Sequence, residues 1–162
     1  MADLKVRELL DRFNVSRESL ARLEAYVALL LAWQRRINLI GPSTVEQIWT
    51  RHIADALQLL PLLPKGTRNI ADLGSGAGIP GLIIAIVTGA CAHLYESNGK
   101  KAAFLREAIR HTQAAATVHQ MRIEDLRHDP ARPKVEAVLA RALAPLVSLL
   151  DHAAPFLEEG AI

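Results

Sequence analysis

The sequence has little cysteine, no long hydrophobic run and no strong excess of either charge. Its single cysteine, Cys91, cannot form a disulfide within the chain, and no group of His and Cys residues has the spacing of metal ligands. No uncharged apolar segment is long enough to span a membrane, and the first residues are charged rather than an apolar signal core. These absences predict a cytoplasmic protein without a metal, a membrane segment or a disulfide.

The charge and composition leave the partners of the chain open. There are 19 Lys and Arg residues against 17 Asp and Glu residues, and the resulting formal net charge of +2 permits contact with a polyanion without requiring it. The 162 residues are 51% hydrophobic and 22% charged, which is enough for one domain with its own core and a small helical appendage. This composition excludes a disordered chain.

The first part of the chain, residues 1–64, has the periodicity of helices and no good strand candidate. Ser16 has the place of an N-cap, and apolar residues spaced three and four apart predict a helix from there to about Arg36. The segment Ser43-Thr44-Val45-Glu46 has the form of a capping box, which predicts that another helix starts there. We therefore expect a helical N-terminal region that packs on the rest of the protein.

The second part, residues 65–162, alternates short apolar segments with helical stretches. This alternation predicts a parallel sheet with crossover helices on both faces, hence an α/β fold. A last helix beginning at Pro145 should lead into a fifth strand at residues 161–162, so we expect a sheet that is incomplete at its C-terminal end. The expected strands are residues 69–73, 92–96, 117–121 and 135–140, and the expected helices before Pro145 are residues 80–88 and 100–112.

The turn between the first expected strand and helix is rich in glycine and has the sequence ADLGSGAGIPGL at residues 71–82. Glycine has no Cβ, so such a turn can fold tightly and bring its backbone N–H groups close to a ligand. Read from Gly76, it matches the fingerprint of NAD or FAD proteins; read from Asp72, it matches the loop of S-adenosylmethionine enzymes. Glu96, at the end of the next strand, can accept hydrogen bonds from ribose hydroxyls in either case. The spacing predicts a nucleoside-containing cofactor and does not choose between the two classes.

A more specific resemblance comes from several blocks that follow one another along the chain. Besides the glycine-rich turn, they are WQRRINLIGP at 33–42, RHIADAL at 51–57, YESNGKKAAFLRE at 95–107, RIEDL at 122–126 and ARALAPL at 140–146. With these blocks the sequence resembles the bacterial small-subunit ribosomal RNA guanine-N7 methyltransferase family, also called the glucose-inhibited division protein B family. The resemblance covers nearly all of the chain.

This resemblance implies a Rossmann-like class I methyltransferase that uses S-adenosylmethionine to methylate N7 of a guanine in 16S ribosomal RNA. Its partner would be 16S RNA or the 30S subunit, and we expect a monomer. Arg141 matches a family arginine next to the cofactor and the target base, so we take it as the catalytic residue. Ile79 stands where the family often has Phe or Leu. The implied cofactor-binding residues are Asp72, Gly74, Gly76, Gly78, Ile79, Glu96, Ser97, Ile123, Glu124 and Arg141.

The implied reaction explains why the sequence needs no general base. Guanine N7 carries a lone pair and no proton, so it can attack a sulfonium methyl group directly. Most of the catalysis would then consist of positioning the two reactants. The guanidinium of Arg141 suits either the edge of the base or a phosphate.

Some polar residues have two interpretations. By their spacing, His52 and Asp55 are a structural pair on one helix, whereas the resemblance gives them an RNA-facing or cofactor-adjacent role. Asn38 either holds a turn or faces the target base, and the basic residues are either a phosphate-binding face or solvated charges. That face would comprise Arg35, Arg36, Arg51, Lys100, Lys101 and Arg122. The RNA-binding residues that we predict are Asn38, Arg51, His52, Lys100 and Arg122.

Two other functions are compatible with the residues. One is an NAD-dependent oxidoreductase, favoured by the Gly76 register, although the chain has no second nucleotide-binding half and no Tyr/Lys or His pair for proton transfer. The other is a chain that binds the cofactor or the ribosome without catalysing a reaction, which an incomplete sheet suggests.

Overall fold

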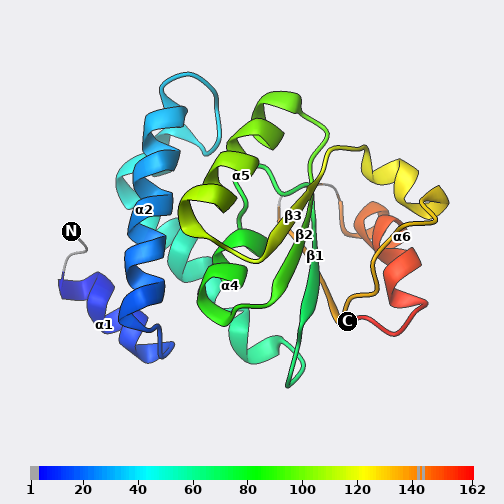
Figure 1. Cartoon of the computed structure of the whole chain (residues 1–162), viewed down its shortest axis with the longest axis horizontal. Coiled ribbons are helices and arrows are strands. Elements are labelled where there is room, and N and C mark those ends of the chain that lie inside the picture. The colour runs from blue at the N-terminus through cyan, green and yellow to red at the C-terminus, as the bar shows by residue number, and fades with distance from the viewer. Residues whose placement is uncertain (1–3, 142, 144) are drawn as a thin grey trace.

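The computed structural model describes residues 4–141, 143 and 145–162, and its centre is a parallel four-stranded sheet with the order β3-β2-β1-β4 (Figure 1). The strands are β1 (Asn69–Leu73), β2 (Cys91–Tyr95), β3 (Ala116–His119) and β4 (Ala137–Ala140). Leu73 of β1 lies beside Tyr95 of β2 and Ala140 of β4, so three strands end at the same level. The predicted α/β fold is confirmed, and each expected strand lies within a residue or two of its observed position. Residues 1–3 of the expected helical region, and Ala142 and Ala144 of the block at 140–146, lie outside the described residues.

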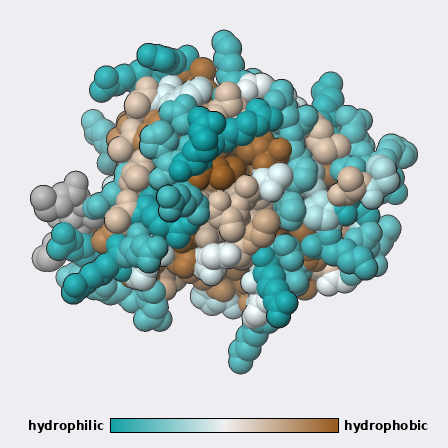
Figure 2. All heavy atoms as spheres, in the orientation of Figure 1, coloured by the Kyte–Doolittle hydropathy of each residue, from teal (hydrophilic) through white to brown (hydrophobic). Residues whose placement is uncertain are grey.

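Helices cover both faces of the sheet (Figure 1). On one face lie α4 (Gly81–Thr88) and α5 (Gly99–Thr112), with α2 (Arg17–Gln34) packed on them and α1 (Leu4–Arg12) beyond. On the other face lie η4, a 3₁₀ helix (Ile123–His128), and α6 (Leu146–Leu157). Seen from the side shown in Figure 2, the molecule has apolar residues in its middle and hydrophilic residues around the rim.

The helix α2 begins and packs as its sequence predicts. Ser16 is its N-cap, with an extended backbone and an Oγ that accepts a hydrogen bond from the Ser19 N–H at 3.0 Å. Leu23 and Leu30 of its apolar stripe are fully buried, Leu20 and Leu31 are partly buried, and the helix packs on α4 and α5. One apolar cluster therefore runs from the N-terminal helices into the α/β part of the chain.

The predicted capping box at Ser43 is wrong. Ser43 lies inside a 3₁₀ helix, η1 (Pro42–Gln47), whose N-cap is Gly41 and has no side chain to accept a hydrogen bond. The Thr44 hydroxyl instead donates to the Gly41 carbonyl at 2.8 Å and lies 2.7 Å from Nε2 of His52. The chain continues as a π-helical turn η2 (Trp49–Ala54), the short helix α3 (Asp55–Leu57) and a 3₁₀ turn η3 (Leu60–Leu62), not as one regular helix.

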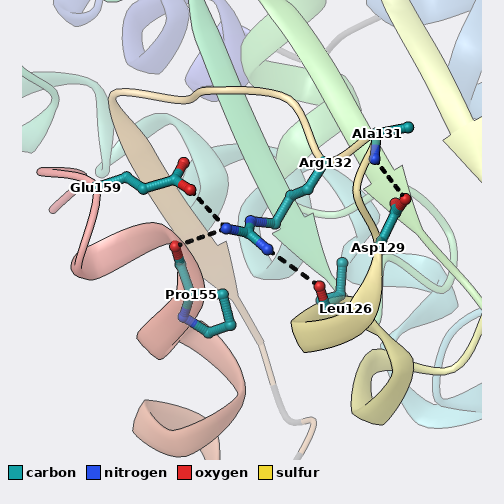
Figure 3. Close-up of polar contacts among 6 residues, drawn as sticks. All are labelled: Leu126, Asp129, Ala131, Arg132, Pro155 and Glu159. Atoms are coloured by element: carbon teal, nitrogen blue, oxygen red, sulfur yellow. Dashed lines mark hydrogen bonds and ion pairs between the residues drawn. The ribbon is translucent and has the colours of Figure 1, made fainter.

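The guanidinium of Arg132 joins the loop before β4 to helix α6 (Figure 3). It donates hydrogen bonds to the Leu126 carbonyl at 3.2 Å, the Pro155 carbonyl at 3.2 Å and the Glu159 carboxylate at 2.6 Å. The same guanidinium carbon lies 5.4 Å from the centre of the Phe156 ring, within cation–π range. This contact fixes the position of η4 relative to α6.

The last residues of the chain meet β4. Pro145 is the N-cap of α6 rather than its first helical residue, and the helix ends at Leu157 as expected. After a turn at Gly160, which has a φ of +97°, the backbone of Ile162 donates to the Glu136 carbonyl and accepts from the Val138 N–H. These two bonds are those of a residue in a neighbouring parallel strand, as the sequence predicts for residues 161–162.

Candidate active site

A cavity of about 390 Å³ opens at the carboxyl ends of β1, β2 and β4, which is where ligands bind in open α/β sheets. We call it the strand-end cavity. Its walls come from the glycine loop, the end of β2, the start of η4 and the segment after β4. It is lined by Gly74, Gly76, Tyr95, Glu96, Ser97, Lys101, Met121, Arg122, Ile123, Glu124, Arg141, Leu143 and His152.

The glycine loop, residues 74–80 between β1 and α4, has a backbone conformation that requires glycine at three positions. Gly74, Gly76 and Gly78 have φ angles of +69°, +55° and +84°, a region that residues with a Cβ rarely adopt. A Cβ on Gly78 would also lie 2.8 Å from Cβ of Leu82 and 3.0 Å from a methyl group of Leu105. Gly74 and Gly76 line the cavity, whereas Gly78 lies beneath the loop against α4 and α5.

Glu96 reaches from the end of β2 to the glycine loop. One carboxylate oxygen accepts from the Gly76 N–H and the other from the Asn98 N–H, both at 2.8 Å. The side chain is buried, yet it lines the cavity, and each oxygen keeps a lone pair for a further donor. Glu96 thus holds the loop and offers acceptors to a ligand at the same time.

Asp72 does not line this cavity. Its side chain is fully buried on the α4 side of β1, where one oxygen accepts from the Gly81 N–H at 3.1 Å. Burial raises the pKa of Asp72 from 3.8 to about 7, against the lowering effect of hydrogen bonding and with the help of the nearby Glu96. The structure therefore places Asp72 under the loop, where it holds the first turn of α4.

The remaining predicted cofactor residues are divided between two cavities. Ser97, Ile123 and Glu124 line the strand-end cavity, and Arg122 joins them in an exposed ion pair with Glu124 at 3.9 Å. Ile79 does not line the strand-end cavity, because it lies on the other side of the glycine loop.

That other side holds a second cavity of about 290 Å³, which we call the loop-side cavity. It lies between the glycine loop and residues 39–55, which we call the N-terminal segment. It shares Gly74, Gly76, Lys101 and Arg141 with the strand-end cavity. The residues that line it alone are Leu39, Ile40, His52, Ser75, Ala77 and Ile79.

Arg141 stands where the two cavities meet. Its guanidinium donates to the backbone carbonyl of Arg51 at 3.2 Å and lies 3.9 Å from the carboxylate of Asp55. These contacts come from the N-terminal segment, whereas Arg141 itself follows β4. The arrangement directs a fixed positive charge into both cavities.

His52 and Asp55 do not form the structural pair that their spacing suggests. The Nε2 atom of His52 bonds with Thr44, and its buried Nδ1 has no hydrogen-bond partner among the described residues. Burial, with the nearby charge of Arg141, lowers the pKa of His52, so the ring is neutral at pH 7. Asp55 faces Arg141 instead.

Three predicted RNA-binding residues, Asn38, Arg51 and Lys100, are not among the residues that line the two cavities. Asn38 is exposed, and the turn around it is held by Gln34, whose side-chain oxygen accepts from the N–H groups of Leu39 and Ile40. Lys100 is exposed in the first turn of α5. Arg51 is exposed and meets the site through its backbone carbonyl.

Besides Arg122, which was predicted to bind RNA, five residues of the strand-end cavity were not predicted as cofactor ligands: Tyr95, Lys101, Met121, Leu143 and His152. The sequence predicts Lys101 only as part of a basic face. A signal was available for Tyr95, which directly precedes Glu96 at the end of a strand. His152 comes from α6, whose position depends on tertiary packing, so no local pattern identifies it.

Across residues 4–141, 143 and 145–162, no group of three or more His, Cys, Asp or Glu side chains could hold a metal ion. In the same part of the chain, none of the helices has the length and apolar character needed to cross a membrane.

The family described as "GidB: rRNA small subunit methyltransferase G" matches residues 19–162. The chain belongs to the GidB family. A relative from Rhodospirillum centenum named ribosomal RNA small subunit methyltransferase G is 55% identical over 150 residues, covering 93% of this chain and 68% of the relative. One of the same name from Rhodospirillum rubrum is 53% identical over 147 residues, covering 91% of this chain and 71% of the relative. The predicted family is thus confirmed, and neither alternative function finds support here.

Solved structures with little sequence similarity share the fold of this GidB chain. A transferase candidate from Pyrococcus horikoshii has a TM-score of 0.55 at 17% identity, covering 74% of this chain and 41% of its own. A hypothetical protein from Thermus thermophilus has a TM-score of 0.50 at 20% identity, covering 75% of this chain and 72% of its own. At these identities the likeness concerns the fold alone.

Proposed function

We propose that this GidB chain transfers a methyl group from S-adenosylmethionine to N7 of a guanine in 16S ribosomal RNA. The observation that carries the proposal is the pair of cavities on either side of one glycine loop, in a chain of the rRNA small subunit methyltransferase G family. One cavity suits a nucleoside cofactor and the other an acceptor base. Arg141 and Lys101 border both.

The residues of the strand-end cavity fit S-adenosylmethionine. Its volume of about 390 Å³ lies in the range of small-molecule sites. The carboxylate of Glu96 would accept hydrogen bonds from the ribose hydroxyls, beside Ser97. Ile123 and Glu124 would meet the adenine, since a backbone N–H and a carboxylate can bind its amino edge. When bound, this cofactor supplies an electrophilic methyl group on a sulfonium.

Gly74 and Gly76 would bring the loop backbone to the methionine end of the cofactor. Gly78 and Asp72 would act indirectly, since Gly78 lets the loop pack on α5 and Asp72 holds the start of α4. Ile79 would lie on the acceptor side.

The loop-side cavity would hold the guanine. Leu39, Ile40 and Ile79 give it apolar walls that can pack on a flat base, and the neutral ring of the buried His52 also lines it. Arg141 would bind the base edge or an adjoining phosphate. Because N7 bears no proton, these residues need only orient the base and exclude water.

The RNA would be held outside the cavities by basic side chains. Arg51, Lys100 and Arg122 are exposed near the site, and with Lys101 they provide positive charge for phosphates. Asn38 is exposed and lines neither cavity, so it would contact the RNA rather than the target base. The protein would act as a monomer in the cytoplasm, on naked 16S RNA or on the 30S subunit.

Transfer of a labelled methyl group, followed by mapping of the modified base, tests the proposal. Wild-type protein is assayed with 16S RNA, with 30S subunits and without RNA, and calorimetry measures the binding of S-adenosylmethionine and of NAD. We expect label on guanine N7 with one of the two RNA substrates. Binding of NAD without binding of S-adenosylmethionine would reject the proposal.

Two variants test the roles that we propose for Glu96 and Arg141. Glu96→Gln should weaken the binding of S-adenosylmethionine about tenfold, because a charged acceptor is replaced by a neutral one. Arg141→Gln should lower the rate at saturating cofactor about a hundredfold, because it removes a charge-assisted contact to the acceptor. Glu158→Gln, an exposed change beyond α6, is the matched control and should leave both values unchanged.

A further inference from the structure

The hydroxyl of Tyr26 connects α2 to the glycine loop. Tyr26 is fully buried, and its hydroxyl donates a hydrogen bond of 2.7 Å to the carbonyl oxygen of Ala77. The ring is fixed as well, because it packs against Phe104 of α5 with 6.3 Å between the ring centres. Burial raises the pKa of Tyr26, so the hydroxyl keeps its proton and remains a donor.

The Ala77 carbonyl belongs to a peptide that is held at both ends. The N–H of the same peptide, on Gly78, donates to the Ser75 carbonyl at 2.6 Å. Because a peptide unit is planar, fixing its carbonyl and its N–H fixes the orientation of the whole unit. This restraint matters here, since the neighbouring glycines have positive φ angles and a wide choice of conformations.

The restrained peptide adjoins the wall between the two cavities. Gly76, directly before Ala77, lines both cavities, and its own N–H is bonded to Glu96. Ala77 lines the loop-side cavity. The loop is therefore fixed from one side by Glu96 of the sheet and from the other by Tyr26 of the N-terminal helices.

We propose that Tyr26 is a positioning residue, whose hydroxyl fixes the Ala77–Gly78 peptide and so holds the glycine loop in the shape that binds the cofactor. The identity of that cofactor rests on the function proposed above, whereas the restraint on the loop does not. Through this hydrogen bond, helix α2 of the helical N-terminal region also shapes the cofactor site.

The test is Tyr26→Phe, which removes the hydroxyl and keeps the ring. We expect the dissociation constant for S-adenosylmethionine to rise about tenfold, and amide exchange at Gly78 in the ligand-free protein to accelerate by a similar factor. The rate at saturating cofactor should change much less than the KM for the cofactor. The matched control is Ser19→Ala, which removes another buried hydrogen bond of α2, from Ser19 to the Ile86 carbonyl of α4.

Both variants should lower the melting temperature, but only Tyr26→Phe should weaken cofactor binding. If both variants lower the melting temperature alike and neither affects binding or Gly78 exchange, Tyr26 has a merely structural role and the proposal is overturned. A wild-type protein that binds no S-adenosylmethionine counts against the proposed function only. The exchange rate of Gly78 in Tyr26→Phe then decides the role of Tyr26 by itself.

Discussion

On one face of the sheet α2, α4 and α5 bury a continuous apolar cluster, whereas on the other face η4 and α6 meet a much smaller one. The large cluster contains Leu23, Leu30 and Phe104, all fully buried. On the other face, Leu146 and Val147 of α6 are 70% and 74% exposed. There the position of the helix depends to a greater extent on the polar contacts of Arg132. The glycine loop is therefore supported by a large apolar core, and the opposite wall of the strand-end cavity by a small apolar cluster together with the guanidinium of Arg132.

The largest effect should come from opening the large cluster. Leu23→Ala should lower the free energy of unfolding by about 2–5 kcal/mol, because it removes buried methyl groups and leaves a cavity. Chemical denaturation followed by circular dichroism measures this loss. The exposed Leu150 of α6 provides the control, and Leu150→Ala should change stability by less than about 0.5 kcal/mol. Equal losses in the two variants would contradict the difference between the faces.

The second effect concerns the opposite face. Arg132→Met should cost about 1–3 kcal/mol, because buried carbonyl acceptors lose their donor. Amide exchange should accelerate in α6 and η4 and stay unchanged in α2 and α4. Arg127→Met, an exposed Arg-to-Met change in the nearby η4, is the control. A uniform acceleration over both faces would show that Arg132 does not act locally.

A buried carboxyl on the apolar face gives an effect that depends on pH. The folded-state pKa of Asp72, about 7, lies above the ordinary value of 3.8, so the folded protein retains a proton that the unfolded chain has lost. This contribution to stability is full below about pH 4 and is lost as the pH rises through 7, by at most about 1.4 kcal/mol per pH unit. Asp72→Asn removes it and keeps an oxygen for the Gly81 N–H. The unfolding free energy of wild type minus variant should fall from pH 4 to 8, and a constant difference would argue against the raised pKa.

The smallest effect on stability is expected at the start of η4, where the side chains are exposed. The ion pair of Arg122 with Glu124 joins side chains that are 77% and 58% exposed, so Arg122→Gln should change stability by less than about 0.5 kcal/mol. Binding to 16S RNA should nevertheless weaken, with a salt dependence reduced by about one ionic contact. Filter binding at several salt concentrations measures both. An unchanged salt slope would remove Arg122 from the RNA-binding residues.

The regular elements could be predicted because their periodicity is local. Ser16 caps its helix as expected, and the strands follow their short apolar runs. The segment from Pro42 to Leu57 could not, because its first helix is capped by Gly41 instead of Ser43, and because Thr44 bonds with Gly41 and with the distant His52. The local pattern has no information about His52, which is brought there by the π-helical turn.

The same limit applies to the site. Glu96 and the glycine loop were predicted from a motif at the ends of strands, and Arg141 was predicted from the family resemblance. The structure brings them together around one cavity. Asp72 matches the motif equally well, but the side of β1 on which it lies turns it away from that cavity. His152 could not be predicted, since it reaches the site only through the packing of α6.

The two hydrogen bonds of the Glu96 carboxylate have a consequence for binding entropy. A free glutamate side chain loses up to about 1.5–2 kcal/mol of rotamer freedom when it is immobilised. Because Gly76 and Asn98 already hold both oxygens, this loss occurs during folding rather than on binding. A diol that reaches the cavity meets an acceptor with fixed direction and unused lone pairs, so more of the energy of each new hydrogen bond remains as affinity.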